Sequence, residues 1–176
     1  MQSSRYDVDG RDRFVGWILL FVQLALLAAV FLLPEGNHWT TPAWLSDGAR
    51  AFSIFGVVVV GIGLVNLGRS ATPLPTPVRD GELHSNGLYR YVRHPIYSGL
   101  MMLVIGSAIP SGSIAVASAA SALVAWLALK ARWEERRLRA RYSGYSAYAS
   151  RTPRFIPSWR RTDRRRPRTS GTGSRA

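Results

Sequence analysis

The feature that most constrains this chain is a series of long apolar segments that contain no charged residue. Residues 14–33 form twenty consecutive positions in which Gln23 is the only strongly polar side chain. That length is enough to cross a hydrocarbon core of about 30 Å. Residues 51–68 and 113–129 are also free of charge. Because a helix satisfies its own backbone hydrogen bonds in lipid, these segments predict an all-α, polytopic membrane helix bundle.

A further apolar segment is shorter than the others and begins at a polar motif. His94-Pro95 marks a helix start, because proline at the first helical position costs no backbone hydrogen bond. Pro110 ends the helix, so residues 95–109 extend over about 22 Å, too short to cross the membrane unaided. The mismatch favours a thinned bilayer or a protein-lined cavity that draws Arg93 and His94 below the headgroups. We therefore expect about four transmembrane helices, at residues 14–33, 51–68, 95–109 and 113–129.

The connecting segments are predicted from helix-breaking residues. Residues 34–50 contain prolines, glycines and tryptophans, which is typical of a short loop along the membrane interface. Residues 69–88 include three prolines within residues 73–77, so they predict a structured surface or re-entrant loop. Glycines 56, 61, 63 and 68 indicate a face for close helix packing.

No helix-breaking residue follows the last span at once. The helix is therefore expected to continue out of the membrane from Lys130 to about Tyr142, followed by a short turn that contains Tyr145 and Tyr148. Together, the end of this helix and the turn are expected to form a cytoplasmic C-terminal helical segment. Residues 1–157 then form a single domain, and residues 158–176 form a disordered basic tail of Arg, Thr, Pro, Ser and Gly.

Positive charge indicates how the chain is oriented. There are 22 arginines and one lysine against ten acidic residues, and 15 of these 23 cations lie at or beyond Lys130. The N-terminal tail carries three and residues 69–93 carry four, whereas residues 34–50 carry one and residues 110–112 none. Because short loops rich in arginine and lysine stay in the cytoplasm, both termini are predicted to be cytoplasmic.

The densest group of functional side chains lies in residues 87–99, with three tyrosines, two arginines, a histidine and a proline. An interfacial belt of aromatic and basic residues is the simplest explanation, but a belt needs no His-Pro pair and no glycine at a fixed offset. At the end of the last helix stand Glu134 and Glu135, which alone would indicate a solvated acidic step paired with neighbouring arginines. Because only three or so residues join the last two helices, these are antiparallel neighbours and their cytoplasmic ends meet.

The convergence of these groups predicts a ligand site. Tyr91, Arg93, His94 and Tyr97 come from one helix start, and the two glutamates come from the other helix end. An arginine fork beside a carboxylate pair matches a ligand that carries its own carboxylate and ammonium. Cysteine is absent, which excludes disulfides and thiolate chemistry, and the three histidines show no metal-ligand spacing, so no metal site is predicted.

The motif Arg93-His94-Pro95-x-Tyr97-x-Gly99, followed some 35 residues later by Glu134-Glu135, resembles the isoprenylcysteine carboxyl methyltransferase family and its phospholipid methyltransferase relatives. The similarity covers about half of the chain, from Pro75 to Pro157. It implies a small membrane methyltransferase that binds S-adenosylmethionine between its helices and the C-terminal segment. By position it implies cofactor-binding roles for Tyr91, His94, Pro95, Tyr97, Gly99, Glu134 and Glu135.

Arg93 and Glu135 are the predicted catalytic residues. Arg93 would hold the carboxylate of the acceptor or of the cofactor, and Glu135, with Glu134 as the alternative, would hold the cofactor's ammonium or ribose. The acceptor would be lipophilic and enter from the bilayer: the carboxylate of an isoprenoid-type substrate, or a lipid amine. Only two spans precede the motif, fewer than in eukaryotic prenylcysteine enzymes. The arginine, alanine and glycine bias suggests a bacterial inner (plasma) membrane.

Two other functions are consistent with parts of the sequence. An NADPH-dependent membrane reductase of the sterol reductase type resembles the C-terminal half, but it would need more spans. A non-enzymatic adaptor would use Arg160 to Arg168 to bind anionic lipid, and would leave the Arg93-His94-Pro95 motif unexplained. Nucleic-acid binding is not expected, because the basic tail lacks interleaved aromatic residues and a folded platform.

Overall fold

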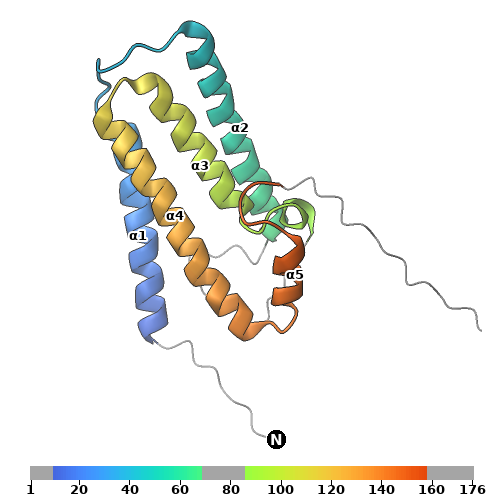
Figure 1. Cartoon of the computed structure of the whole chain (residues 1–176). Helices are drawn as coiled ribbons and strands as arrows, with labels where there is room; N and C mark the ends of the chain where they lie inside the picture. The colour runs from blue at the N-terminus through green and yellow to red at the C-terminus, as the bar shows by residue number, and fades with distance from the viewer. Residues whose placement is uncertain (1–9, 69–85, 158–176) are drawn as a thin grey trace, which may run out of the picture.

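The computed structural model describes residues 10–68 and 86–157, and in these residues it contains helices and no strand. The all-α fold class is confirmed. Figure 1 shows α1 to α4 side by side, with α5 folded back beside the end of α4 and near the start of α3. The elements in order are α1 (Gly10–Leu32), α2 (Ala43–Leu67), η2 (Gly87–Arg90, a 3-10 helix), α3 (Pro95–Ala108), η3 (Ile109–Ser111, a 3-10 helix), α4 (Ile114–Arg141) and α5 (Tyr145–Arg151).

Three of these helices are long and apolar enough to cross a membrane, namely α1 from Phe14, α2 and α4. The chain is an integral membrane protein. The apolar helix that runs from Pro95 to Ser111 is shorter than the other three. The predicted short third helix is therefore confirmed, with His94 as its N-cap residue and Pro95 at its first position.

The second helix begins earlier than predicted. Its first residue is Ala43, so the prediction of a loop up to Arg50 was wrong for residues 43–50. Pro42 precedes the helix with a φ of −56°, and proline there needs no hydrogen-bond donor. Within the added turns, Arg50 donates to Asp47 at 3.1 Å across one helical turn. Pro42, which was expected to lie within a loop, therefore marks the start of a helix.

The predicted helical continuation of the last span and the turn after it are confirmed, since α4 continues to Arg141 and α5 contains both tyrosines of that turn. The proline-rich loop of residues 73–77, most of the N-terminal tail and the basic tail from residue 158 lie outside the described residues. The predictions for these segments stay predictions.

The bundle is held by close helix packing. A Cβ atom on Gly99 would lie 2.6 Å from the carbonyl oxygen of Gly56, so α2 and α3 can approach this closely only because both positions are glycine. Near the start of α3, Gly63 packs against Ile96, whereas Gly61 has no such neighbour. This contact holds the polar end of α3 against the end of α2.

Candidate active site

The start of α3 is joined to the C-terminal segment by backbone hydrogen bonds. The N–H of Arg93 donates to the carbonyl of Pro153 at 2.9 Å, and the N–H of His94 donates to the carbonyl of Arg154 at 3.1 Å. The hydroxyl of Ser98 donates to the carbonyl of Phe155 at 2.8 Å. Figure 1 shows this segment after α5 lying across the start of α3. Residues 153–155 therefore close one side of the motif.

Glu135 is the centre of the polar cluster and is only 2% exposed. Arg154 donates to it as a fork, with Nε at 2.8 Å and Nη2 at 2.7 Å from the two carboxylate oxygens. Arg93 Nη1 lies 3.3 Å and His94 Nε2 lies 3.2 Å from the same carboxylate. Two guanidinium groups and an imidazole thus surround one buried carboxylate, which stabilises its charge.

Glu134 has fewer partners than Glu135. The hydroxyl of Tyr97 donates to it at 2.5 Å, and His94 Nδ1 lies 3.8 Å away. The rings of His94 and Tyr97 are stacked, with centroids 5.3 Å apart and planes 4° from parallel. His94 therefore stands between the two glutamates, while no arginine ion pair is seen on Glu134 among the described residues.

Tyrosines hold the outer wall of the cluster in place. The hydroxyl of Tyr148 on α5 donates to the carbonyl of Tyr89 in η2 at 2.6 Å. Burial raises the pKa of Tyr148 to about 12, and burial likewise raises the pKa of Tyr89 to about 12. Both hydroxyls therefore stay protonated at neutral pH. The hydrogen bonds to Glu135 raise the pKa of Arg154, which keeps its guanidinium charged.

Two buried polar groups in the cluster have unused hydrogen-bonding capacity. Arg93 Nε and the hydroxyl of Tyr145 are buried without a hydrogen-bond partner among the described residues. Tyr145 is 1% exposed, so its hydroxyl is enclosed by protein. A buried donor without a partner is costly, which makes this corner suited to a carboxylate or a water molecule.

The structure brings together most of the predicted site residues, but not all. Arg93, His94, Tyr97, Glu134 and Glu135 form one connected cluster, as the predicted meeting of the two helix ends requires. The other predicted residues, Tyr91, Pro95 and Gly99, lie outside this set of contacts.

Each of the three outlying residues has a distinct place. Tyr91 is 59% exposed, and Pro95 is buried at the first position of α3. Gly99 faces α2, where a Cβ would meet the Gly56 carbonyl and Val60. Helix geometry thus accounts for Pro95 and close packing for Gly99.

The sequence interpretation assigned no role to Arg154, the strongest partner of Glu135, although it lies within the segment that carried the family resemblance. It also assigned none to Lys130, the one lysine of the chain, which is buried one turn before Glu134. Its Nζ donates to Gln23 on α1 at 2.7 Å. Within residues 10–68 and 86–157, no three His, Cys, Asp or Glu side chains are grouped to hold a metal ion.

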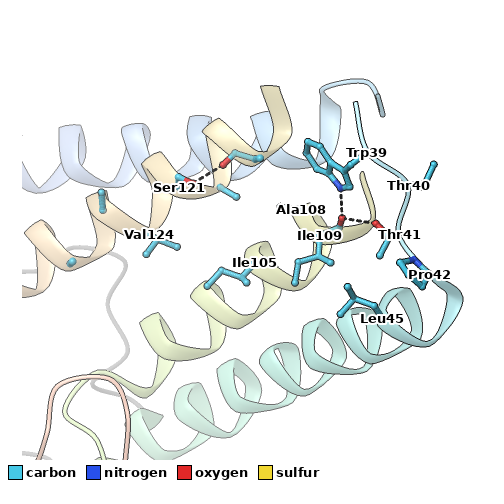
Figure 2. Close-up of a pocket in the computed structure, with 14 residues that line it drawn as sticks. Trp39, Thr40, Thr41, Pro42, Leu45, Ile105, Ala108, Ile109, Ser121 and Val124 are labelled. Atoms are coloured by element: carbon cyan, nitrogen blue, oxygen red, sulfur yellow. Dashed lines mark hydrogen bonds between the residues drawn. The ribbon is translucent and has the colours of Figure 1, made fainter. Parts of the chain in front are cut away.

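A cavity of about 710 Å³ lies away from the cluster, between α2, α3 and α4. Figure 2 shows Trp39 and Thr41 at its edge, both donating to the carbonyl of Ile109, at 2.9 and 3.1 Å. Its walls are mostly apolar and include Ile105 of α3 and Ala128 of α4. Ala128 and Glu135 are seven residues, or about two turns, apart, so they lie on the same side of α4. The cluster therefore lies about 10 Å beyond Ala128 along the helix.

Comparison with known proteins agrees with this geometry. The family model described as phospholipid methyltransferase matches residues 48–144, which include the start of α3 and both glutamates. The chain belongs to this family. Protein-S-isoprenylcysteine O-methyltransferase B of Arabidopsis thaliana is 28% identical over 79% of this chain and 71% of its own length.

Two further relatives are similar to the chain. Methanethiol S-methyltransferase 2 of Bradyrhizobium diazoefficiens is 27% identical over 96% of this chain and 76% of its own length. Protein-S-isoprenylcysteine O-methyltransferase A of Arabidopsis thaliana is 29% identical over 61% and 54%. No solved structure matches the chain. The protein is a membrane methyltransferase.

Proposed function

We propose that the protein transfers a methyl group from S-adenosylmethionine to a lipophilic acceptor at the cytoplasmic face of the membrane. The observation that carries this proposal is the cluster around Glu134 and Glu135, which joins the two halves of the family motif. Residues 153–155 close the cluster from outside, and the apolar cavity lies further along α3 and α4, toward the other end of the bundle.

The cluster suits a ligand with an amino-acid end. In the part of the chain that the structure describes, Arg93 Nε and the hydroxyl of Tyr145 are buried without a hydrogen-bond partner, and they would bind the carboxylate. Glu134 carries fewer protein contacts than Glu135, so it would bind the ammonium or the ribose hydroxyls. Glu135 would hold Arg93, His94 and Arg154 in position. When bound, S-adenosylmethionine supplies a methyl group already activated on its sulfonium.

The arrangement favours an acceptor that needs no base. His94 Nε2 lies 3.2 Å from Glu135 and Nδ1 lies 3.8 Å from Glu134, so both ring nitrogens face carboxylates of the cluster. A carboxylate acceptor attacks with a lone pair and releases no proton, whereas an amine must lose one. The geometry therefore favours a lipophilic carboxylate over a lipid amine. Alignment of donor and acceptor and exclusion of water would provide the acceleration.

The route of the acceptor is proposed from the cavity. Its apolar walls lie between helices that face lipid, and the side of α4 that lines it continues to Glu135. An isoprenoid or acyl chain would occupy this groove while its polar end reached the cluster. The positively charged loops support a cytoplasmic position for the cluster and for both termini.

The proposal is tested by titrating S-adenosylhomocysteine into the detergent-purified protein by calorimetry. Wild type is expected to bind in the micromolar range, and His94→Ala and Glu135→Ala should abolish measurable binding. Asp47→Ala is the matched control, because it removes an exposed carboxylate that lies on α2 outside the cluster.

A folded wild type that fails to bind S-adenosylhomocysteine would overturn the proposed cofactor. Binding of NADPH in its place would then identify the reductase alternative. With cofactor binding established, methyl transfer from radiolabelled S-adenosylmethionine to an isoprenoid carboxylic acid, beside a phospholipid amine, would test the acceptor.

A further inference from the structure

Lys130 and Gln23 form a buried polar contact that the proposed chemistry does not use. Lys130 is 4% exposed, and its Nζ donates to the Gln23 side-chain oxygen at 2.7 Å. Gln23 is the one strongly polar residue of the first span, and it lies outside residues 48–144 that the family model matches. Polar and ionisable side chains inside a membrane are costly and mark functional positions by default.

Lys130 also touches the ligand cluster. Its ammonium lies 5.4 Å from the centroid of the Tyr97 ring, within the range of a cation–π contact. The same tyrosine donates its hydroxyl to Glu134, which lies one helical turn beyond Lys130 on α4. The ammonium is therefore placed against the ring that orients Glu134.

The direction of the Lys130 side chain needs an explanation. A lysine near a helix end in lipid normally extends its ammonium toward the headgroups. Here the ammonium is enclosed, and its hydrogen bond is to α1. Gln23 thus holds the charge inside the bundle, where it contacts Tyr97.

We propose that Gln23 and Lys130 form a positioning pair for the cofactor site, in which α1 holds the Lys130 ammonium against Tyr97 and so fixes the Tyr97–Glu134 contact. This inference rests on the proposed function, since Glu134 is taken as a cofactor ligand. It makes the first span a part of the site, although the family match begins after it.

The structure offers a matched control for a purely structural role. Trp126, one turn before Lys130, donates from Nε1 to the backbone oxygen of Leu19 at 3.2 Å. Leu19 lies one turn before Gln23 on α1, so both contacts join the same stretches of α4 and α1. Trp126→Phe removes one such link, and within residues 10–68 and 86–157 Trp126 makes no hydrogen bond or ring contact with the cluster.

The test is calorimetric titration of S-adenosylhomocysteine into the full chain in detergent, with the unfolding temperature measured for each variant. Lys130→Met and Gln23→Leu should each weaken binding about tenfold, whereas Trp126→Phe should change it less than about twofold. Gln23→Glu should bind S-adenosylhomocysteine more tightly than Gln23→Leu and close to wild type, because a carboxylate can hold the same ammonium. The double variant Lys130→Met with Gln23→Leu should be no weaker than either single variant, as expected for residues that act as a unit.

Each result decides the proposal. If wild type binds and folded Lys130→Met and Gln23→Leu bind equally well, the pair has no positioning role and the inference fails. If Trp126→Phe weakens binding as much as Gln23→Leu, the contact serves only helix association and the inference also fails. Failure of wild type itself to bind would overturn the proposed function and this inference with it.

Discussion

The two ends of the helix bundle are built on opposite principles. At one end, α3 and α4 meet through charged side chains that surround Glu135, and residues 153–155 cover them. At the other end, the side chains of Trp39 and Thr41 in the loop before α2 donate hydrogen bonds to the backbone carbonyl of Ile109. An apolar cavity lies beside this loop. The charged end depends on each partner being present, whereas the apolar end depends mainly on shape.

The largest expected effect follows from removing the charge at the centre of the polar end. Glu135→Gln should lower the free energy of unfolding by about 3 kcal/mol, because it leaves the largely buried Arg93 and the fork of Arg154 without their counter-charge. Cofactor binding should be lost as well. Thermal unfolding in detergent, followed by circular dichroism, measures the change, and Asp47→Asn provides the control with an exposed carboxylate. An unfolding temperature equal to that of wild type would show that Glu135 is not the centre of the cluster.

A smaller loss of stability is expected when only the ion pair between Arg154 and Glu135 is removed. Arg154→Ala should cost about 1.5 kcal/mol, since the charge-assisted fork is lost but Glu135 keeps Arg93 and His94. Arg154→Lys should be more stable than Arg154→Ala but less stable than wild type, because an ammonium cannot donate as a planar fork.

The control for that variant is Arg151→Ala, an exposed arginine on α5 that donates to a backbone carbonyl within its own helix. Chemical unfolding and calorimetric titration of S-adenosylhomocysteine would be run on all three variants. Equal behaviour of the alanine variants at positions 151 and 154 would contradict the assigned role of Arg154.

The difference between the two ends also explains how much the sequence could predict. The spans and the short third helix follow from uninterrupted apolar runs and from Pro95 and Pro110, so local signals were sufficient. The early start of α2 was missed because Pro42 and Gly48 were interpreted as loop residues, whereas Pro42 precedes a helix that tolerates the glycine.

The candidate site was predictable only in part. Its two halves are far apart in sequence but close in space, and the short connection between α3 and α4 predicted that they meet. Arg154 and the contact between Gln23 and Lys130 depend on how separate segments fold back onto the cluster, which neither periodicity nor spacing encodes. The aromatic Tyr91 was assigned from its place in the motif, yet it is exposed.

An intermediate effect tests the outer wall of the cluster at the polar end. Tyr148→Phe should lower the free energy of unfolding by about 1 kcal/mol through loss of its hydrogen bond to the Tyr89 carbonyl. The folded-state pKa of Tyr148 is about 12, above its ordinary value of 10.0. The contribution is therefore complete below pH 10 and is lost as the pH rises toward 12.

Urea unfolding of wild type and the phenylalanine variant at several pH values would measure this difference. It should be constant from about pH 6 to pH 9 and decrease above about pH 10. A difference that already falls between pH 6 and pH 8 would contradict the raised pKa, and another titrating group would then control the wall.

The smallest effect on folding and cofactor binding is expected at the apolar end, where shape is the main requirement. Ala128→Phe places a large apolar side chain into the cavity, so stability and affinity for S-adenosylhomocysteine should stay close to wild type. Transfer to a lipophilic acceptor should nevertheless fall about tenfold, because the ring occupies the proposed acceptor route. Ala122→Phe is the control, since that exposed position on α4 does not line the cavity. Equal transfer rates for the two variants would separate the cavity from catalysis and leave the polar end as the whole of the active site.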